Sequence, residues 1–174
     1  MTRIKYATFV ALLATVAATN LALETWGVIP IGFGLEAPAG VFFAGLAFGL
    51  RDVLHETGGP RWVVGAILAG AALSYVLSDG AEIPGGHVSI AAASAVAFLL
   101  SELCDMAVYT PLREKHWGAA ATASNVVGAV VDSALFLWLA FGSLSLLLGQ
   151  VVGKTYMVAL ALPLVRLARK QVAR

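Results

Sequence analysis

Four polar residues lie inside two long apolar stretches in the second half of the chain. Glu102 and Asp105 interrupt the first stretch, and Asn125 and Asp132 interrupt the second. A carboxylate at the centre of a membrane helix costs about 2.5 to 3.5 kcal/mol on insertion scales, so it is kept where it faces a partner, a cavity or a pathway. The two stretches are therefore predicted to line a polar site inside a membrane protein.

The composition of the chain also indicates a membrane protein. Of its 174 residues, 60% are hydrophobic and 12% are charged, whereas a typical soluble domain carries about 25% charged residues. A helix needs about 20 apolar residues to cross a bilayer, so the chain has room for at most about six or seven spans. The sequence therefore predicts a single transmembrane domain over residues 1–174, with no separate soluble domain.

An all-α fold of six transmembrane helices is predicted from apolar runs that are separated by turn-forming residues. The first run begins with Arg3 and Lys5, as a secretory signal does, but its spanning length favours a helix that stays in the protein. Glycine and proline predict a loop over residues 24–38. The third helix carries Gly65 and Gly70, whose small size favours close helix packing. The predicted helices span residues 4–23, 39–56, 61–77, 88–109, 118–141 and 144–166.

The basic residues are distributed unequally between the two ends of these helices. Every Lys and Arg except Lys154 lies at or near the start of the first helix, the turn between the second and third, the turn between the fourth and fifth, or the end of the sixth. The loops at 24–38, 78–87 and 142–143 contain none. Because Lys and Arg favour the cytoplasmic side of a membrane, both termini are predicted to be cytoplasmic.

The polar residues of the fourth and fifth helices share faces. Glu102, Asp105 and Tyr109 follow i, i+3, i+7 spacing and form one stripe. Asn125 and Asp132 are seven residues apart and form a second stripe on the next helix. The sequence thus predicts polar stripes on two consecutive helices.

Depth along each helix divides the polar residues into two layers. At 1.5 Å per residue, Asp132 and Lys154 lie roughly 14 and 15 Å from the outer ends of their helices, where they could pair. Arg51, Glu102 and Asn125 lie roughly 20 to 24 Å from the outer ends and form a second layer. Two stacked layers favour a route across the membrane, although an ion pair that only fixes helix packing remains an alternative.

The second helix ends in the charged segment RDVLHE. Asp52 and Glu56 share one face, and Arg51 and His55 share a neighbouring face. These side chains are expected near the inner surface, where long charged side chains can stay in contact with water.

Several kinds of chemistry have no signature in the sequence. There is no GxxxxGK[ST] phosphate-binding loop, so no ATPase is expected within the chain. There is no GxSxG or HExxH motif, and the chain is not expected to be an enzyme. No His or Cys pair has the spacing of metal ligands, and no basic patch interleaved with aromatic residues suggests nucleic acid. We therefore expect no metal, no cofactor and no nucleic-acid partner.

The polar motifs of the fourth and fifth helices resemble those of a known family. The relevant segments are SELCD at residues 101–105, VY at 108–109, SN at 124–125, DS at 132–133 and AFG at 140–142. Together they resemble the pattern of the queuosine precursor transporter family, also called the VUT family.

The first half of the chain resembles the same family. Arg51, Asp52 and Glu56 resemble its RD-x-x-x-E stretch, and Asn20 resembles an asparagine in its first helix. The resemblance implies a transporter in a bacterial-type cytoplasmic (inner) membrane. It also implies import of 7-cyano-7-deazaguanine, its aminomethyl relative, or both, for transfer RNA modification.

The polar residues suit a guanine-like base. Such a base presents two adjacent N–H donors, which a carboxylate such as Glu102 or Asp132 could accept. Its carbonyl could accept from Asn125, Gln150 or Lys154. An aromatic side chain could stack on the ring. The predicted substrate-binding residues are Asn20, Arg51, Glu102, Asp105, Tyr109, Asn125, Asp132, Gln150 and Lys154.

Two other functions fit the same sequence. The chain could be the substrate-binding membrane subunit of an ATP-driven vitamin or nucleobase importer, or a structural membrane protein whose polar residues only hold helices together.

For the transporter, either Tyr109 or Phe136 is expected to stack on the substrate. Carboxylates at this depth could also take up protons, so the sequence permits proton coupling, and it leaves a homo-oligomer open.

Overall fold

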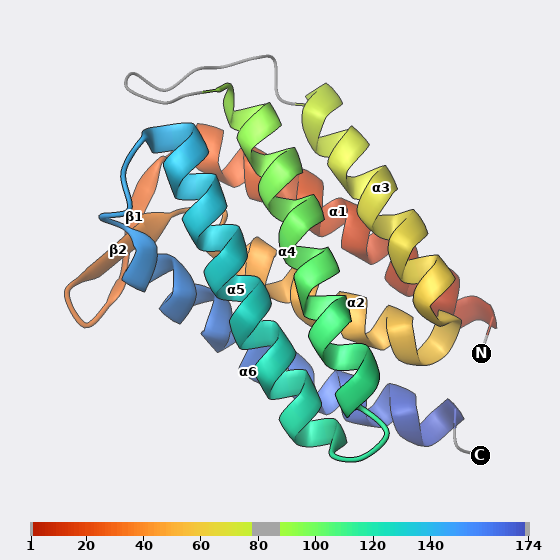
Figure 1. The fold of residues 1–174 in the computed structure, drawn as a ribbon. Helices are drawn as coiled ribbons and strands as arrows, with labels where there is room; N and C mark the ends of the chain where they lie inside the picture. Colours follow the sequence, from red (N-terminus) through yellow and green to blue (C-terminus); the bar gives the residue numbers. More distant parts are fainter. Residues whose placement is uncertain (1, 78–87, 173–174) are drawn as a thin grey trace.

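The computed structural model describes residues 2–77 and 88–172, and the helical fold predicted from the sequence is confirmed there. Within these ranges the chain forms six helices (Figure 1). They are α1 (Thr2–Trp26), α2 (Val41–Gly58), α3 (Pro60–Leu77), α4 (Ile90–Leu112), α5 (Trp117–Phe141) and α6 (Leu147–Val172).

The six helices differ in their capacity to cross a membrane. Four of them, α1, α4, α5 and α6, are long and apolar enough to do so, and α3 is a shorter apolar helix. The 18 residues of α2 include three charged side chains, Arg51, Asp52 and Glu56. The prediction of six spans is therefore supported by length and composition for four helices, whereas α2 relies on the other helices to cover its charges.

A β-hairpin occupies part of the segment that the sequence predicted to be only a loop. Strand β1 (Val28–Gly32) pairs antiparallel with β2 (Leu35–Pro38). The turn uses positive φ angles at Gly32, Phe33 and Gly34, which glycine adopts readily. The hairpin packs on α6 at Gly149, where a Cβ atom would collide with the carbonyl oxygen of Glu36. The glycine and proline residues do form a turn, as the sequence predicts. The two short strands that flank the turn were not predicted.

Helix α2 lies inside the bundle and packs directly on α1 and α6 (Figure 1). The closest approach of α2 to α6 is at Gly45 and Gly49, which lie one helical turn apart. A Cβ atom at Gly45 would lie 2.6 Å from the Lys154 carbonyl oxygen, and one at Gly49 would collide with Ala161. The small-residue packing expected in the third helix is found at Gly70 of α3, where a Cβ atom would lie 2.9 Å from Phe98 Cε1, but not at Gly65, where it would meet open space.

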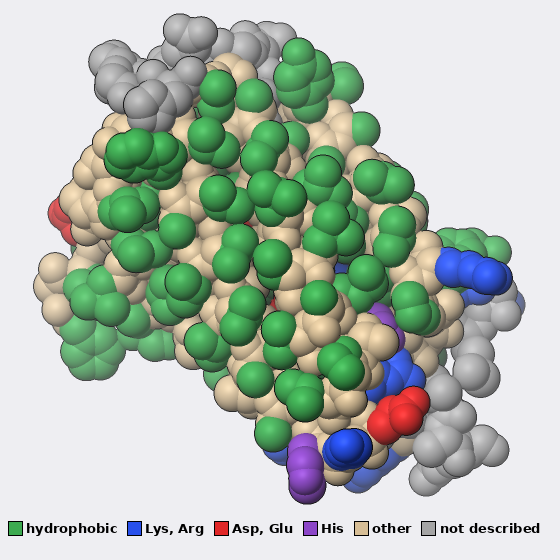
Figure 2. Space-filling view, in the orientation of Figure 1, with side chains coloured by type: hydrophobic (Ala, Val, Ile, Leu, Met, Phe, Trp, Pro, Cys, Tyr) green, Lys and Arg blue, Asp and Glu red, His purple; other side chains and the backbone are tan. Residues whose placement is uncertain are grey.

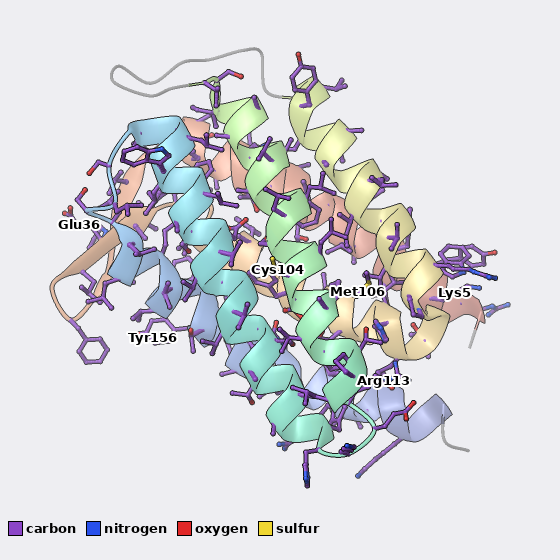
Figure 3. The ribbon with its side chains drawn as sticks, viewed as in Figure 1. Lys5, Glu36, Cys104, Met106, Arg113 and Tyr156 are labelled. Carbon is purple, nitrogen blue, oxygen red and sulfur yellow. The ribbon has the colours of Figure 1, made fainter. Side chains whose placement is uncertain are left out.

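The basic residues gather at one end of the bundle. The start of α1, the α2–α3 turn, the α4–α5 turn and the end of α6 all lie at that end (Figure 1). Figure 2 shows Lys and Arg side chains there, and Figure 3 places Lys5 and Arg113 in this region. The arrangement agrees with the predicted charge alternation, whereas the cytoplasmic location of this end stays a prediction. The predicted loop at 78–87 lies outside the described residues.

Apolar side chains cover the outside of the bundle. Figure 2 shows hydrophobic side chains spread over the face of α3, α4 and α5. Leu68, Leu100, Val126 and Val130 are among the large apolar residues exposed on these helices. An apolar exterior around a polar interior is the arrangement that a lipid environment requires, because charged side chains are costly in hydrocarbon.

Candidate functional site

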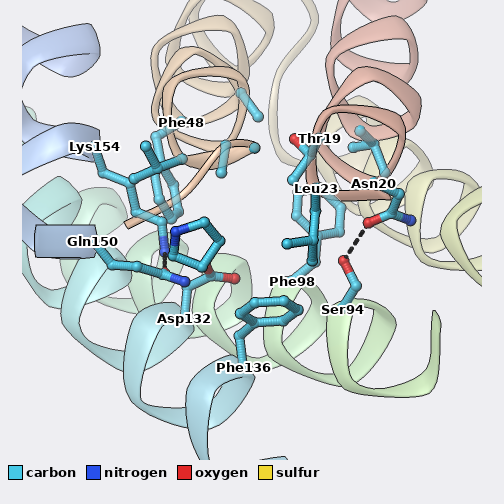
Figure 4. Close-up of a pocket in the computed structure, with 16 residues that line it drawn as sticks. Thr19, Asn20, Leu23, Phe48, Ser94, Phe98, Asp132, Phe136, Gln150 and Lys154 are labelled. Atoms are coloured by element: carbon cyan, nitrogen blue, oxygen red, sulfur yellow. Dashed lines mark hydrogen bonds and ion pairs between the residues drawn. The ribbon is translucent and has the colours of Figure 1, made fainter. Parts of the chain in front are cut away.

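A cavity opens between α1, α2, α4, α5 and α6, in the half of the bundle nearer the hairpin (Figure 4). It contains about 610 Å³ of space not filled by protein atoms, part of which is open to the surroundings. Its walls are contributed by five helices, which makes it a candidate site for a small molecule.

An ion pair forms one polar end of the cavity, as the depth estimate predicted. The Lys154 ammonium donates to Asp132 Oδ2 at 2.5 Å, to Ser133 Oγ at 2.7 Å and to Gln150 Oε1 at 2.7 Å. Lys154 is almost fully buried, and the Asp132 side chain keeps 14% exposure. The ammonium has three N–H donors, and all three are used by the protein.

At this end of the cavity, Gln150 and Asp132 keep hydrogen-bonding groups that Lys154 does not use and that could recognise a ligand. An ammonium only donates hydrogen bonds, so it must face the oxygen of the Gln150 amide, which turns the amide NH₂ away from Lys154. Asp132 Oδ1 is contacted only by the Ser101 hydroxyl, at 3.4 Å, among the described residues. A carboxylate has about four lone-pair positions. Asp132 can therefore accept further hydrogen bonds while Gln150 donates.

The opposite polar end of the cavity is formed by Asn20 of α1. Ser94 donates to Asn20 Oδ1 at 2.9 Å, and Asn20 Nδ2 donates to Ser74 Oγ at 2.7 Å (Figure 4). These contacts connect α1 to α3 and α4. The amide is thereby fixed at the cavity wall.

Three phenylalanine rings line the cavity between its polar ends. Phe48 comes from α2, Phe98 from α4 and Phe136 from α5 (Figure 4). Aromatic rings provide flat apolar surfaces on which a planar heterocycle can stack. Phe136 was named from the sequence, but Phe48 and Phe98 were not. A signal existed, because Phe48 precedes the charged residue Asp52 by one helical turn on the same face.

A second polar layer surrounds Arg51, which is fully buried. Its guanidinium contacts Asp52 at 2.8 Å and Glu102 at 2.9 Å, and it also pairs with Asp105. Asn125 Nδ2 donates to Asp52 Oδ2 at 2.8 Å. The predicted layer of Arg51, Glu102 and Asn125 therefore exists, but the protein's own groups fill it, and it does not line the cavity between α1, α2, α4, α5 and α6.

A third polar layer lies near the basic end and corrects one expectation from the sequence. The Tyr109 hydroxyl donates to Glu56 Oε1 at 2.5 Å, and Arg113 donates to His55 Nδ1 at 2.6 Å. The expectation that Asp52 and His55 stay hydrated is wrong, because they are only 1% and 2% exposed. Both side chains turn inward, where polar groups of α4 and α5 replace water.

The nine predicted site residues therefore fall into two groups. Of the two rings considered for stacking on a substrate, Phe136 lines the cavity, whereas Tyr109 is buried against Glu56 and is absent from the cavity wall. Asn125 lines a separate groove between α5 and α6. Four of the nine line the cavity between α1, α2, α4, α5 and α6, namely Asn20, Asp132, Gln150 and Lys154. Those outside it are Arg51, Glu102, Asp105, Tyr109 and Asn125.

Comparison with known proteins identifies the family. A family model described as putative vitamin uptake transporter matches residues 38–168, which is well over half of the chain. This match covers all six cavity side chains of α4, α5 and α6, as well as the Arg51 layer. No curated protein and no solved structure has significant similarity to the chain. With its apolar helices and this family match, the chain is a multi-pass membrane protein that belongs to the family of putative vitamin uptake transporters.

Proposed function

We propose that the chain imports 7-deazaguanine precursors of queuosine and binds them in the cavity between α1, α2, α4, α5 and α6. The observation that supports this most is the combination of Asp132 and Gln150 at one end of the cavity with phenylalanine rings along its walls. The substrate class comes from the motif resemblance of α4 and α5. Membership of a transporter family supports the movement of a small molecule.

The polar end of the cavity matches the hydrogen-bonding edge of a deazaguanine. The substrate's N1–H and exocyclic amine are adjacent donors, and Asp132 retains acceptor positions for both. The substrate's neighbouring carbonyl can accept from the Gln150 amide, whose NH₂ is turned away from Lys154. Lys154 holds this arrangement in place rather than contacting the substrate, because Asp132, Gln150 and Ser133 use its donors.

The cavity walls match the flat shape of the substrate. Base stacking on an aromatic side chain contributes about 1 to 3 kcal/mol. Phe48, Phe98 and Phe136 lie on three different helices, so a bound ring would connect α2, α4 and α5. A substrate that connects helices in this way can favour one arrangement of the bundle over another, which transport requires.

Uptake by cells that cannot make queuosine precursors tests this function. Cells that express the chain alone should accumulate labelled 7-cyano-7-deazaguanine and incorporate the label into transfer RNA, whereas vector controls should not. Uptake that requires a co-expressed ATPase would instead identify a binding subunit of an ATP-driven importer. The absence of uptake in both cases, with the protein present in the membrane, would reject the proposal in favour of a structural role.

A further inference from the structure

The layer around Arg51 contains more acidic than basic groups. One guanidinium is surrounded by the carboxyl groups of Asp52, Glu102 and Asp105, and all four side chains are at most 1% exposed. With every group ionised, this layer would hold two uncompensated negative charges. An unpaired charge in a buried site is so costly that a group usually changes its protonation state instead.

Three acceptor atoms of the layer lack a donor, because the terminal nitrogens of Arg51 face Asp52 Oδ1 and Asp105 Oδ1 instead. Glu102 Oε1, Asp105 Oδ2 and Asn125 Oδ1 are buried and have no hydrogen-bond partner among the described residues. When the acids are ionised, all three atoms only accept hydrogen bonds, so they cannot satisfy one another. A proton on one of the carboxyl groups would supply the missing donor and remove one negative charge.

The neighbouring charged groups do not supply this donor. On the cavity side, Lys154 donates to Asp132, Ser133 and Gln150. On the basic side, Arg113 contacts His55 and lies 3.9 Å from Glu56. The Tyr109 hydroxyl also donates to Glu56. These groups are thus engaged with one another, whereas His55 Nε2 is buried without a partner, and no hydrogen bond joins it to Asp52, Glu102 or Asp105 among the described residues.

We propose that Asp52, Glu102 and Asp105 form a proton-binding site that couples transport to a proton gradient. The coupling part of this inference rests on the proposed function, whereas proton binding does not. The proton adds to a carboxylate oxygen from the outer aqueous phase and leaves the same oxygen for the inner phase.

The site lies between the cavity and the basic end of the bundle. Ser101 precedes Glu102 in α4, and its hydroxyl contacts Asp132 Oδ1 of the cavity at 3.4 Å. On the other side, Asp52 is followed one turn later in α2 by Glu56. Protonation of the layer can therefore influence the Asp132 end of the cavity through α4, without direct contact with the substrate.

Infrared spectroscopy of the purified full chain tests proton binding. The wild type should show a protonated-carboxyl band at neutral pH that shifts in deuterium oxide. The double variant Glu102→Gln/Asp105→Asn leaves one acid, Asp52, beside Arg51 and should lose the band. The control Asp132→Asn should retain it. A wild type without the band, or a double variant that keeps it, would overturn the inference. If the double variant does not fold, the wild-type spectrum alone decides whether the layer binds a proton.

Transport into liposomes tests coupling. With the membrane potential clamped at zero, one proton per substrate and a gradient of one pH unit should give about tenfold accumulation of 7-cyano-7-deazaguanine, because each pH unit is a tenfold ratio of proton activity. The double variant should show no gradient-driven accumulation. Equal uptake with and without the gradient, or accumulation driven by sodium instead, would overturn coupling and leave the proposed function intact. A pH-sensitive carboxyl band in a protein that moves no deazaguanine would instead reject the proposed function and retain the proton site.

Discussion

Asp132→Asn is expected to reduce uptake of 7-cyano-7-deazaguanine at least about thirtyfold, because loss of one partner from a buried, charged hydrogen-bonded contact costs about 2 to 5 kcal/mol. Asparagine has nearly the same shape as aspartate but presents one acceptor oxygen and one donor amide. It cannot accept both adjacent N–H groups of the substrate. Initial uptake rates, normalised to the amount of protein in the membrane, measure the effect.

The ion pair with Lys154 requires a second variant, because Asp132→Asn also leaves a buried ammonium without its carboxylate. The double variant Asp132→Asn/Lys154→Met removes both charges, which buried pairs often tolerate. If Asp132 contacts the substrate, the double variant should be as stable as the wild type and still fail to take up substrate. Restored uptake would show that the pair only stabilises the fold. Glu24→Gln provides the control, since Glu24 is an exposed acid outside the cavity.

Arg51→Met is expected to destabilise the folded protein by about 3 to 5 kcal/mol, because it removes the cation from a buried cluster of acids. Arg51 is the only basic group that contacts Asp52, Glu102 and Asp105 among the described residues. Lysine should not replace it well, because an ammonium cannot reproduce the planar fork of guanidinium donors. The thermal unfolding midpoint in detergent and the amount of folded protein in the membrane measure the loss.

A compensating variant separates charge from packing. Addition of Glu102→Gln and Asp105→Asn to Arg51→Met removes two buried acids and should recover much of the lost stability. Arg61→Met is the matched control, because Arg61 is exposed at the start of α3 and its loss should leave the midpoint nearly unchanged. An Arg51→Met protein as stable as the wild type would contradict the assignment of Arg51 as the central cation of the layer.

The sequence predicted the helices, and it predicted that Asp132 and Lys154 lie at the same height in the bundle. Long apolar runs produce a helix wherever the backbone must satisfy its own hydrogen bonds in lipid. Counting 1.5 Å per residue then brought Asp132 to the height of Lys154, and the structure shows that they pair. Depth alone was sufficient in this case because the two residues lie on adjacent helices, α5 and α6.

Depth could not distinguish a residue that lines a cavity from one that is sealed among partners. Glu102 and Asp132 are both acids on consecutive helices, yet Glu102 binds Arg51 and Asp132 lines the cavity. The difference depends on the rotation of α2, which the close packing of Gly45 and Gly49 against α6 fixes. The aromatic walls were missed for a related reason: Phe48 shares a helical face with Asp52, but only the orientation of α2 shows that this ring reaches the cavity.

A structure of the protein with 7-cyano-7-deazaguanine tests the central claim most directly. The ligand should lie in the cavity between Phe48 and Phe136, with its adjacent N–H donors on the Asp132 carboxylate and its carbonyl on the Gln150 amide. A ligand found in the groove beside Asn125, or a cavity that stays empty at saturating ligand, would contradict this account of where and how the protein holds its substrate.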